Sequence, residues 1–352
     1  MKIINNISKH IELSYDPFPA FGTVHVPVVL WFEIGKKEGS PKEIFLDPLE
    51  SMQMSPFNSS LHYGQSIFEG LKAFRLNQEE VGIFRPELNA ARFQRSAQIM
   101  AMADFDPELF MNCLTAYVKE CKSYVPKEEG HSLYLRPLLI ANDSVIKVQS
   151  SSTYRFVIMS SIVGPYFKKG AKGSRVLINK SFIRAFPGGT GEAKTAANYA
   201  LSLQGLEHAH AEEYDQVLYV DALKKEKIEE LGGMNFFMVK NGELYTPKLD
   251  GQILHGITRR SILEIARSVG IVCHEEDVLL KDITEGRASE VFAVGTAASV
   301  ASIAELGLQE SRDSEIISYK FESTAMADKL RRILLDTQTG KTEFSKTWIK
   351  KV

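Results

Sequence analysis

Two long, mainly apolar segments constrain the fold of this chain more than any other feature. They are HSLYLRPLLIAN (131–142) and TYRFVIMSSIV (153–163). A strand that is solvated on one face alternates apolar and polar residues, whereas a strand that is covered on both faces is apolar almost throughout. Strand-like and helix-like segments alternate around these two. The sequence therefore predicts an α/β or α+β fold whose sheets are covered on both faces or curled into a barrel.

The length of the chain predicts about two domains, because 352 residues correspond to about two units of ~150 residues. The candidate boundary is GPYFKKGAKGSR (164–175), which holds three glycines, one proline and four basic residues and is typical of a linker. We expect a small N-terminal domain over 1–165, a linker over 166–176 and a larger C-terminal domain over 177–352.

Charge and cysteine content argue against several kinds of partner. Lysine plus arginine (42) and aspartate plus glutamate (44) nearly balance, so there is no basic surplus to favour nucleic acid. No apolar run approaches the ~20 residues of a membrane-spanning helix, and the N-terminus lacks the basic and apolar regions of a signal peptide. The three cysteines form no CxxC pair, which predicts reduced thiols in a cytoplasmic protein and no metal site.

The most unusual segment is RAFPGGTGEAKTAANYA (184–200), where a glycine-rich turn leads into Lys194 among small residues. The glycines let the backbone approach a bulky group, but the segment matches neither a Walker A loop nor a G-x-G-x-x-G turn. Lys194 is either an exposed helix lysine, which is the commoner case, or a desolvated amine. Removing water lowers the pKa of an amine and prepares it for Schiff-base chemistry, as pyridoxal phosphate (PLP) requires.

Such a cofactor also needs a partner at its ring nitrogen and a donor at its phenolic oxygen. Glu229 and Glu230 precede a glycine pair and are candidates for the first role, with a solvated acidic strand end as the alternative for either. Tyr199 follows Lys194 by five residues, which places the two about 140° apart on an ideal helix. Both can reach one ligand only if Lys194 lies outside the regular helix.

Three places could bind the phosphate of the cofactor. A helix expected from Ile257 offers the N–H groups of Ile257 and Thr258 at its positive end. The turn that contains Thr296 and Ala297 offers a hydroxyl and further N–H groups. Arg92 shares a helix face with apolar residues, where a bare charge is unfavourable. Its guanidinium therefore needs either a phosphate or a neighbouring carboxylate in a structural salt bridge.

Candidate substrate residues lie in two other segments. In LYLRP, the period of two places Tyr134 and Arg136 on one face of a strand, where they form either a structural edge or a site that reads a carboxylate. Tyr63 and Phe68 in HYGQSIFEGLKAF could line an apolar pocket, although isolated aromatic residues belong more often to a core.

Together these segments carry a family resemblance. The chain resembles the class IV, fold type IV PLP-dependent aminotransferases, and most closely the branched-chain amino acid aminotransferases. The resemblance implies a smaller N-terminal α/β domain, a larger C-terminal pseudo-barrel domain that binds PLP, and a homodimer. The matching segments, in family order, are HYGQSIFEGLKAF, FRPELNAARFQRSA, LYLRPLLI, RAFPGGTGEAKTAANYA, IEELGGMNFF, LHGITRRSILEIA and SEVFAVGTAA.

The resemblance also implies roles for single residues. Lys194 matches the catalytic lysine that holds the cofactor as a Schiff base. Tyr199 matches the tyrosine at the phenolic oxygen, and Glu230 matches the glutamate at the pyridine nitrogen. The residues that match the phosphate-binding positions are Arg92, Ile257, Thr258 and Thr296.

On the substrate side, the resemblance implies an α-carboxylate site and a side-chain pocket. The α-carboxylate position matches Tyr63 and the backbone of Thr296 and Ala297. The pocket residues that match are Phe68 and Tyr134 on the apolar wall, and Arg136 where the second carboxylate of glutamate would be held.

The implied activity is transamination between leucine, isoleucine or valine and 2-oxoglutarate, giving branched 2-oxo acids and L-glutamate. The expected partners are therefore small amino acids and 2-oxo acids, with no nucleic acid and no membrane. The alternatives are a D-amino acid transaminase or an aminodeoxychorismate lyase of the same fold, or a catalytically silent PLP-binding protein. The long segment before residue 60 and the LYLRP motif favour the branched-chain interpretation.

Overall fold

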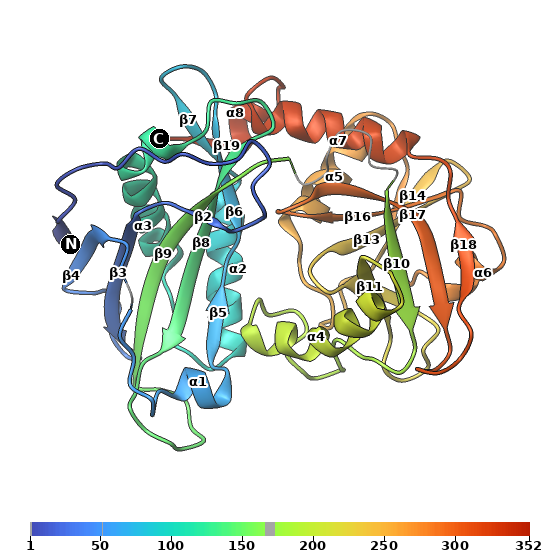
Figure 1. Cartoon of the computed structure of the whole chain (residues 1–352), viewed down its shortest axis with the longest axis horizontal. Coiled ribbons are helices and arrows are strands. Elements are labelled where there is room, and N and C mark those ends of the chain that lie inside the picture. The colour runs from blue at the N-terminus through green and yellow to red at the C-terminus, as the bar shows by residue number, and fades with distance from the viewer. Residues whose placement is uncertain (1, 51, 166–172) are drawn as a thin grey trace. The chain divides into compact units, whose positions relative to one another are not determined.

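The computed structural model describes residues 2–50, 52–165 and 173–352. These residues form two compact units (Figure 1). The first combines the described residues within 1–168 with 193–197 and 337–352, and the second combines those within 169–192 and 198–336. The sequence predicts contiguous domains, whereas both units are assembled from separated stretches of chain.

Hydrogen bonding explains why two late stretches belong to the first unit. Thr195 pairs with Ile67 in an isolated β-bridge, which attaches residues 193–197. The C-terminal strand β19 (Ile349–Lys351) pairs antiparallel with β7 (Val81–Phe84), which attaches residues 337–352. Long-range pairing of this kind leaves no local pattern in the sequence.

The expected linker over 166–176 is described only at its end. Residues 166–172 lie outside the described residues. Ser174 already begins strand β10 (Ser174–Asn179), which pairs in parallel with both β11 (Gln216–Val220) and β17 (Ser299–Gln309). The last residues of the expected linker, 174–176, are therefore part of a sheet.

The first unit is built on a sheet of ten described strands, ordered β1-β4-β3-β9-β8-β6-β7-β19, with β2 on β9 and β5 on β8. Its longest pairing is antiparallel and joins the two apolar segments that the sequence singles out, with Ser132 opposite Val163 and Ala141 opposite Tyr154. The other strands of this sheet are β1 (Lys2–Asn5), β2 (Val24–His25), β3 (Val28–Gly35), β4 (Glu43–Pro48), β5 (Ser66–Phe68), β6 (Leu71–Arg75), β8 (Ser132–Ala141) and β9 (Thr153–Val163).

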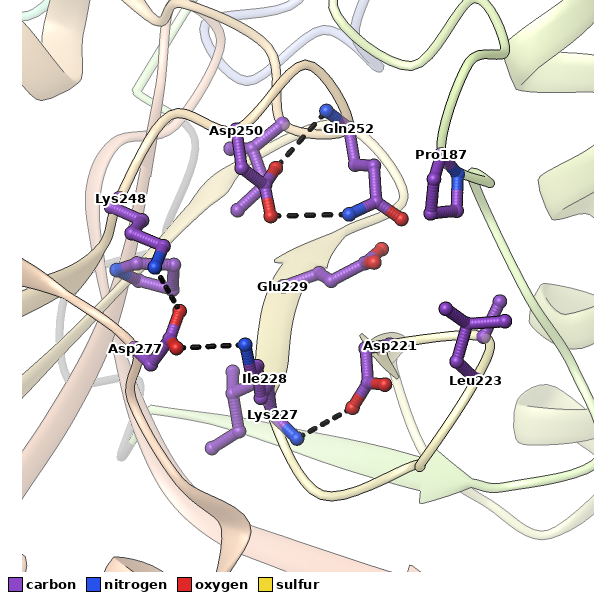
Figure 2. Close-up of a pocket in the computed structure, with 13 residues that line it drawn as sticks. Pro187, Asp221, Leu223, Lys227, Ile228, Glu229, Lys248, Asp250, Gln252 and Asp277 are labelled. Carbon is purple, nitrogen blue, oxygen red and sulfur yellow. Dashed lines mark hydrogen bonds and ion pairs between the residues drawn. The ribbon is translucent and has the colours of Figure 1, made fainter.

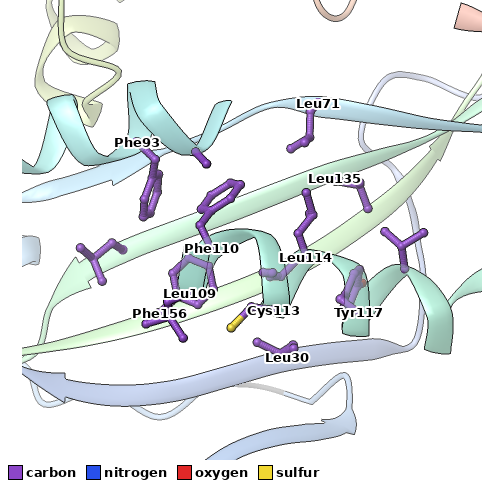
Figure 3. Close-up of a cluster of buried hydrophobic side chains, with 14 of the residues drawn as sticks. Leu30, Leu71, Phe93, Leu109, Phe110, Cys113, Leu114, Tyr117, Leu135 and Phe156 are labelled. Atoms are coloured by element: carbon purple, nitrogen blue, oxygen red, sulfur yellow. The ribbon is translucent and has the colours of Figure 1, made fainter. Parts of the chain in front are cut away.

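Two helices contribute side chains to the core of this unit. They are α2 (Pro86–Ile99) and α3 (Pro107–Glu120), and each has proline in its first turn, where the missing N–H is harmless. Figure 3 shows Phe110, Cys113, Leu114 and Tyr117 of α3 within this core, at the i, i+3, i+4, i+7 spacing of one helix face. The shorter helices of the unit are α1 (Ser59–Tyr63), α8 (Ser345–Trp348) and a 3₁₀ turn at Lys122–Tyr124.

The second unit contains a closed ring of strands. The ring runs β12-β11-β10-β17-β16-β13 and closes because β13 also pairs with β12 through Glu230 and Asn235. Strands β14, β15 and β18 extend the sheet beyond the ring. This arrangement confirms the expected barrel-like sheet. The remaining bounds are β12 (Ile228–Leu231), β13 (Asn235–Lys240), β14 (Glu243–Pro247), β15 (Cys273–Glu276), β16 (Glu290–Gly295) and β18 (Ile317–Lys320).

The helices of this part of the chain are α4 (Ala196–Ala211), α5 (Ile257–Ser268), α6 (Leu280–Thr284) and α7 (Ala325–Gln338). A two-residue hairpin turn at Asn241-Gly242 joins β13 and β14, with φ of 55° and 78° at the two residues. Positive φ at both central positions is what a two-residue hairpin turn requires.

In the part of the chain that the structure describes, no helix is long and apolar enough to cross a membrane. Within the same residues, no group of three or more His, Cys, Asp or Glu side chains could hold a metal ion. The cysteines are unpaired thiols, with Cys113 and Cys121 buried.

Candidate active site

In the first unit, Lys194 lies just before α4, outside the regular helix. Its backbone continues the edge of β5: the Lys194 N–H donates to Ser96 Oγ at 3.0 Å, and its carbonyl accepts from the Phe68 N–H at 3.0 Å. Thr195 Oγ1 donates to the Ser66 carbonyl at 2.7 Å. The half-buried Lys194 side chain places Nζ 4.8 Å from the centre of the Phe68 ring. The structure therefore places the amine against an aromatic face instead of along an exposed helix.

Two glycines shape the turn that leads to Lys194. Gly188 has φ of 79°, a conformation that glycine adopts without strain. A Cβ atom at Gly191 would collide with the backbone of Gln252, so only glycine fits there. The turn is held by Thr190 and Asn198, since Thr190 Oγ1 donates to Asn198 Oδ1 and Asn198 Nδ2 donates to the Thr190 carbonyl, both at 2.7 Å.

The same unit brings together Phe68, Tyr134 and Arg136. Arg136 Nη2 donates to Tyr134 Oη at 3.1 Å, and the guanidinium carbon lies 4.6 Å from the centre of the Phe68 ring. The Phe68 ring thus contacts both the Lys194 amine and the Arg136 guanidinium. Together these side chains form a largely apolar wall with one positive charge, on Arg136, which the Tyr134 hydroxyl masks. Tyr63 lies at the end of α1 and is 40% exposed.

Lys72 is a buried residue that sequence reasoning missed. It lies on β6 directly opposite Tyr134 on β8 and is 7% exposed. Burial lowers the pKa of its ammonium to about 8, because an apolar environment disfavours the charged form. The segment GLKAFR reads as an ordinary strand, and nothing local in it distinguishes a buried lysine from an exposed one.

Arg92 is paired with Glu69, another residue that sequence reasoning missed. Arg92 Nε contacts Glu69 Oε1 at 2.7 Å, and Nη2 contacts Oε2 at 2.8 Å. Asn89 Nδ2 also donates to Glu69 Oε2, at 2.7 Å. Both partners are buried, so the two-point pairing holds the plane of the guanidinium in one orientation.

In the second unit, the carboxyl group of Glu230 on β12 is held by several donors. Its Oε2 accepts from Asn235 Nδ2 at 2.6 Å, and its Oε1 accepts from the Leu254 N–H at 3.2 Å. Arg184 forms an ion pair with Oε1 at 3.1 Å. These contacts favour the ionised form. Sequence reasoning missed Arg184, although it opens the glycine-rich segment.

The neighbouring Glu229 is a different kind of carboxyl group. It is 3% exposed, and neither of its oxygens has a hydrogen-bond partner among the residues that the structure describes. Burial raises the pKa of Glu229 to about 8. Of the two glutamates that the sequence leaves open, Glu230 is the one whose carboxyl oxygens contact hydrogen-bond donors and Arg184.

The two phosphate candidates of this unit lie near Asn235. Asn235 pairs with Val294 at the end of β16, two residues before Thr296. Asn235 Nδ2 also donates to the Leu254 carbonyl at 3.0 Å, close to the start of α5. Helix α5 begins at Ile257 after Gly256, which caps it without a side-chain hydrogen bond, and α5 packs on β16. The N–H groups of Ile257 and Thr258 stand at the positive end of this helix.

Tyr199 lies on α4 in the same unit. An added Cβ at Gly233, three residues beyond Glu230, would lie 3.9 Å from Tyr199 Cε1. The Tyr199 ring and the turn after β12 are therefore neighbours. The second unit thus groups Tyr199, Glu230, the start of α5 and the end of β16, while Lys194, Arg92, Phe68, Tyr134 and Arg136 belong to the first.

Comparison with known proteins identifies the family to which this chain is similar. A family model described as amino-transferase class IV matches residues 66–306. Branched-chain-amino-acid transaminase 1 of Bacillus subtilis (strain 168) is 40% identical over 306 residues, which cover 86% of this chain and 85% of that protein.

Solved structures agree in fold. The branched-chain aminotransferase from Thermoproteus uzoniensis, determined with norvaline, has a TM-score of 0.75 and 25% identity, covering 92% of this chain and 99% of that chain. The branched-chain amino acid aminotransferase from Thermobaculum terrenum in its PLP form has a TM-score of 0.72 and 22% identity, covering 92% and 98%. The expected fold type and the resemblance found in the motifs are both confirmed, and the chain belongs to the class IV aminotransferases.

Proposed function

We propose that this protein is a PLP-dependent transaminase that moves the amino group between leucine, isoleucine or valine and 2-oxoglutarate. The names of its relatives support this activity. The structural observation that carries it is the Phe68 ring, which contacts the Lys194 amine on the one hand and the Arg136 guanidinium on the other. A reactive amine beside a largely apolar wall with one masked cation suits both an alkyl and a carboxylate side chain.

The residues of the second unit fit the cofactor. PLP supplies an electron sink when it is bound. Glu230, an anion with three donors, would hold the ring nitrogen in its protonated form, and Tyr199 would donate to the phenolic oxygen. For the phosphate, the positions available in this unit are the N–H groups of Ile257 and Thr258 and the Thr296 hydroxyl. Arg92 is the phosphate candidate of the first unit, where its pairing with Glu69 fixes the plane of the guanidinium.

Lys194 is the catalytic group. As a neutral amine it removes the proton from the substrate Cα and returns a proton during the second half of the cycle. The Phe68 ring, whose centre lies 4.8 Å from Nζ, keeps water away from that side of the amine. The backbone hydrogen bonds of Lys194 to Ser96 and Phe68 hold its backbone against α2 and β5.

Substrate selection follows from the wall next to Lys194. Phe68 and Tyr134 contact an alkyl side chain, while the Tyr134 hydroxyl satisfies one N–H of Arg136. When the substrate is glutamate or 2-oxoglutarate, Arg136 binds the second carboxylate. The α-carboxylate is proposed to bind at Tyr63 and at the backbone of Thr296 and Ala297.

We also propose a cytoplasmic homodimer. An exposed apolar surface lies on α1 and the neighbouring loop of the first unit, which are linked by a bridge between Asn58 and Ser144. Leu61 is 63% exposed, Ile146 57% and Val148 84%. Large exposed apolar side chains are common in interfaces, and light scattering of the purified protein would test the dimer.

The proposed activity is tested with a panel of amino donors under single-turnover conditions. L-leucine, L-isoleucine and L-valine should each convert the bound cofactor to its amine form, and 2-oxoglutarate should reverse the change. D-alanine and aminodeoxychorismate should react poorly. Activity on these two alone would overturn the proposal, and a yellow protein without any half-reaction would show a silent PLP-binding protein.

A further inference from the structure

The second buried carboxyl group of β12, Glu229, has a structural setting that the proposed reaction does not use. Adjacent strand residues point to opposite faces, so Glu229 and Glu230 face different surroundings. Glu229 lines a pocket of about 110 Å³ together with Pro187, Asp221, Ala222, Leu223, Lys227, Ile228, Pro247, Lys248, Asp250, Gln252, Ile253 and Asp277.

Within this pocket, two hydrogen-bond acceptors face each other. Figure 2 shows the Glu229 carboxyl group and the Gln252 side chain pointing toward one another. Asp250 accepts both from the Gln252 N–H and from its Nε2, each at 3.1 Å, which leaves the amide oxygen as the end directed to the pocket. Gln252 Oε1 and both Glu229 oxygens are buried and lack partners among the described residues. A carboxylate can only accept hydrogen bonds, whereas a protonated carboxyl group can donate one to an amide oxygen such as Gln252 Oε1.

The charges around Glu229 oppose one another. The positive charge of Arg184 favours the ionised form of Glu229, while Glu230, Asp250 and Asp221 disfavour it. Burial outweighs Arg184 and raises the pKa of Glu229 to about 8. The two lysines at the pocket do not supply a counter-charge for Glu229, because both pair with Asp277.

Arg184 connects this pocket with Glu230. Its Nη1 pairs with Glu230 Oε1 at 3.1 Å, and its Nη2 donates to the backbone carbonyl of Gln252. With Glu229 protonated, the buried Arg184–Glu230 pair has no net charge. A protonated ring nitrogen beside Glu230 would add one positive charge to this buried cluster, and an ionised Glu229 would balance it.

We propose that Glu229 is a positioning residue. It holds a proton when no cofactor ring is bound beside the Arg184–Glu230 pair, and it releases this proton to the solvent in the pocket when a protonated pyridine ring binds at Glu230. This inference rests on the proposed function, since it assigns the cofactor ring to Glu230. Its consequence is that the buried cluster stays neutral in both states, and the ring nitrogen keeps its proton during the reaction.

The test is infrared difference spectroscopy of the cofactor-free protein and of the protein loaded with PLP. The cofactor-free protein should show the C=O stretch of a buried carboxylic acid, and this band should disappear on loading. Glu229→Gln should lack the band in both states. Glu226→Gln is the matched control, because Glu226 is an exposed glutamate two residues before β12. If Glu229→Gln folds poorly, Glu229→Met removes the same proton with a side chain of similar length.

A second measurement separates a structural role from this one. Glu229→Gln should slow the leucine half-reaction about tenfold, which is ~1.4 kcal/mol in the barrier, while the affinity for leucine stays unchanged. A band that is absent without cofactor, or that persists after loading, overturns the inference. Failure to take up PLP, seen as missing cofactor absorbance, overturns the proposed function and the inference with it, and is distinguished from the other outcomes by that absorbance.

Discussion

Arg136 is hydrogen-bonded to Tyr134, with Nη2 and Oη 3.1 Å apart, and its guanidinium lies over the Phe68 ring. Tyr134 and Arg136 are neighbours on one face of β8, so this strand carries both the positive charge of Arg136 and the Tyr134 hydroxyl that masks it. A pocket built in this way can accept an alkyl side chain without leaving a bare cation, and can still bind a carboxylate.

Replacing Arg136 should therefore separate the two substrates. Arg136→Met is expected to lower kcat/KM for 2-oxoglutarate by about 10- to 100-fold, because a charge-assisted hydrogen bond contributes roughly 1.5–3 kcal/mol, and to change the leucine half-reaction by less than about threefold. Stopped-flow measurement of both half-reactions checks this. Tyr134→Phe is the matched control, since it unmasks the cation and should weaken leucine more than glutamate. Equal losses for both substrates would contradict the assigned roles.

Lys194 should be the site of covalent attachment to the cofactor. Reduction of the loaded protein with borohydride, followed by peptide mapping, is expected to find the pyridoxyl group on Lys194. Lys194→Ala should lose at least about 10³-fold in rate, within the range for removal of a catalytic acid–base group. Attachment at Lys180, which is ion-paired with Glu310 at 2.7 Å, would contradict the assignment of Lys194 as the lysine that binds the cofactor.

Glu230→Gln should affect chemistry more than folding. The amide keeps an acceptor oxygen for only one of the two donors, Asn235 Nδ2 and the Leu254 N–H, and it removes the charge opposite Arg184. We expect the half-reaction to slow by roughly 10²- to 10³-fold, with a loss of stability of about 1–3 kcal/mol. Rates by stopped flow and melting by calorimetry check the two parts. Glu243→Gln, an alteration on β14 of the same unit, should leave the rate unchanged. A Glu230→Gln variant with normal rates would exclude Glu230 as the ring-nitrogen partner.

Lys72 should make stability depend on alkaline pH. Its pKa is lowered from 10.5 in the unfolded chain to about 8 in the folded protein, so the unfolded state binds more protons between these values and stability rises with pH across them. Below pH 8 the free-energy cost of burying the charged Lys72 ammonium is fully present. Lys72→Met should therefore raise the free energy of unfolding by up to about 3 kcal/mol at pH 7, and the gain should fade toward pH 10.5. Denaturant melts from pH 6 to pH 11 would show it, and a gain that is constant across this range would contradict it.

The sequence predicted the features that depend on neighbouring residues. The apolar segments that form β8 and β9 are an example, and the structure confirms them as strands. Local signals also mark the prolines that begin α2 and α3 and the Asn241-Gly242 turn. Helix α4 begins at Ala196, two residues after Lys194, which leaves Lys194 outside the helix.

Features that depend on distant pairs could not be predicted. Glu69 lies 23 residues before Arg92 and reads as an ordinary acidic residue between a strand and a glycine. The Arg184–Glu230 pair and the burial of Lys72 are likewise set by how strands meet across a sheet, which composition and periodicity do not encode. Alternation places Glu229 and Glu230 on opposite faces, but only the positions of Asn235, Leu254 and Arg184 determine which of the two is the fixed anion.

The pairing of β19 with β7 has a consequence for biosynthesis. Arg85, directly after β7, donates its N–H to the Trp348 carbonyl at 2.7 Å, and its guanidinium lies 4.0 Å from the centre of the Trp348 ring. As the polypeptide leaves the ribosome, β7 is made early but lacks its outer neighbour until residue 351 has emerged. The strand ring between β10 and β17 can close before that moment. Nascent chains that stall before residue 349 should thus contain the completed strand ring of the second unit. The edge of β7 in the first sheet is then still unpaired and accessible to chaperones.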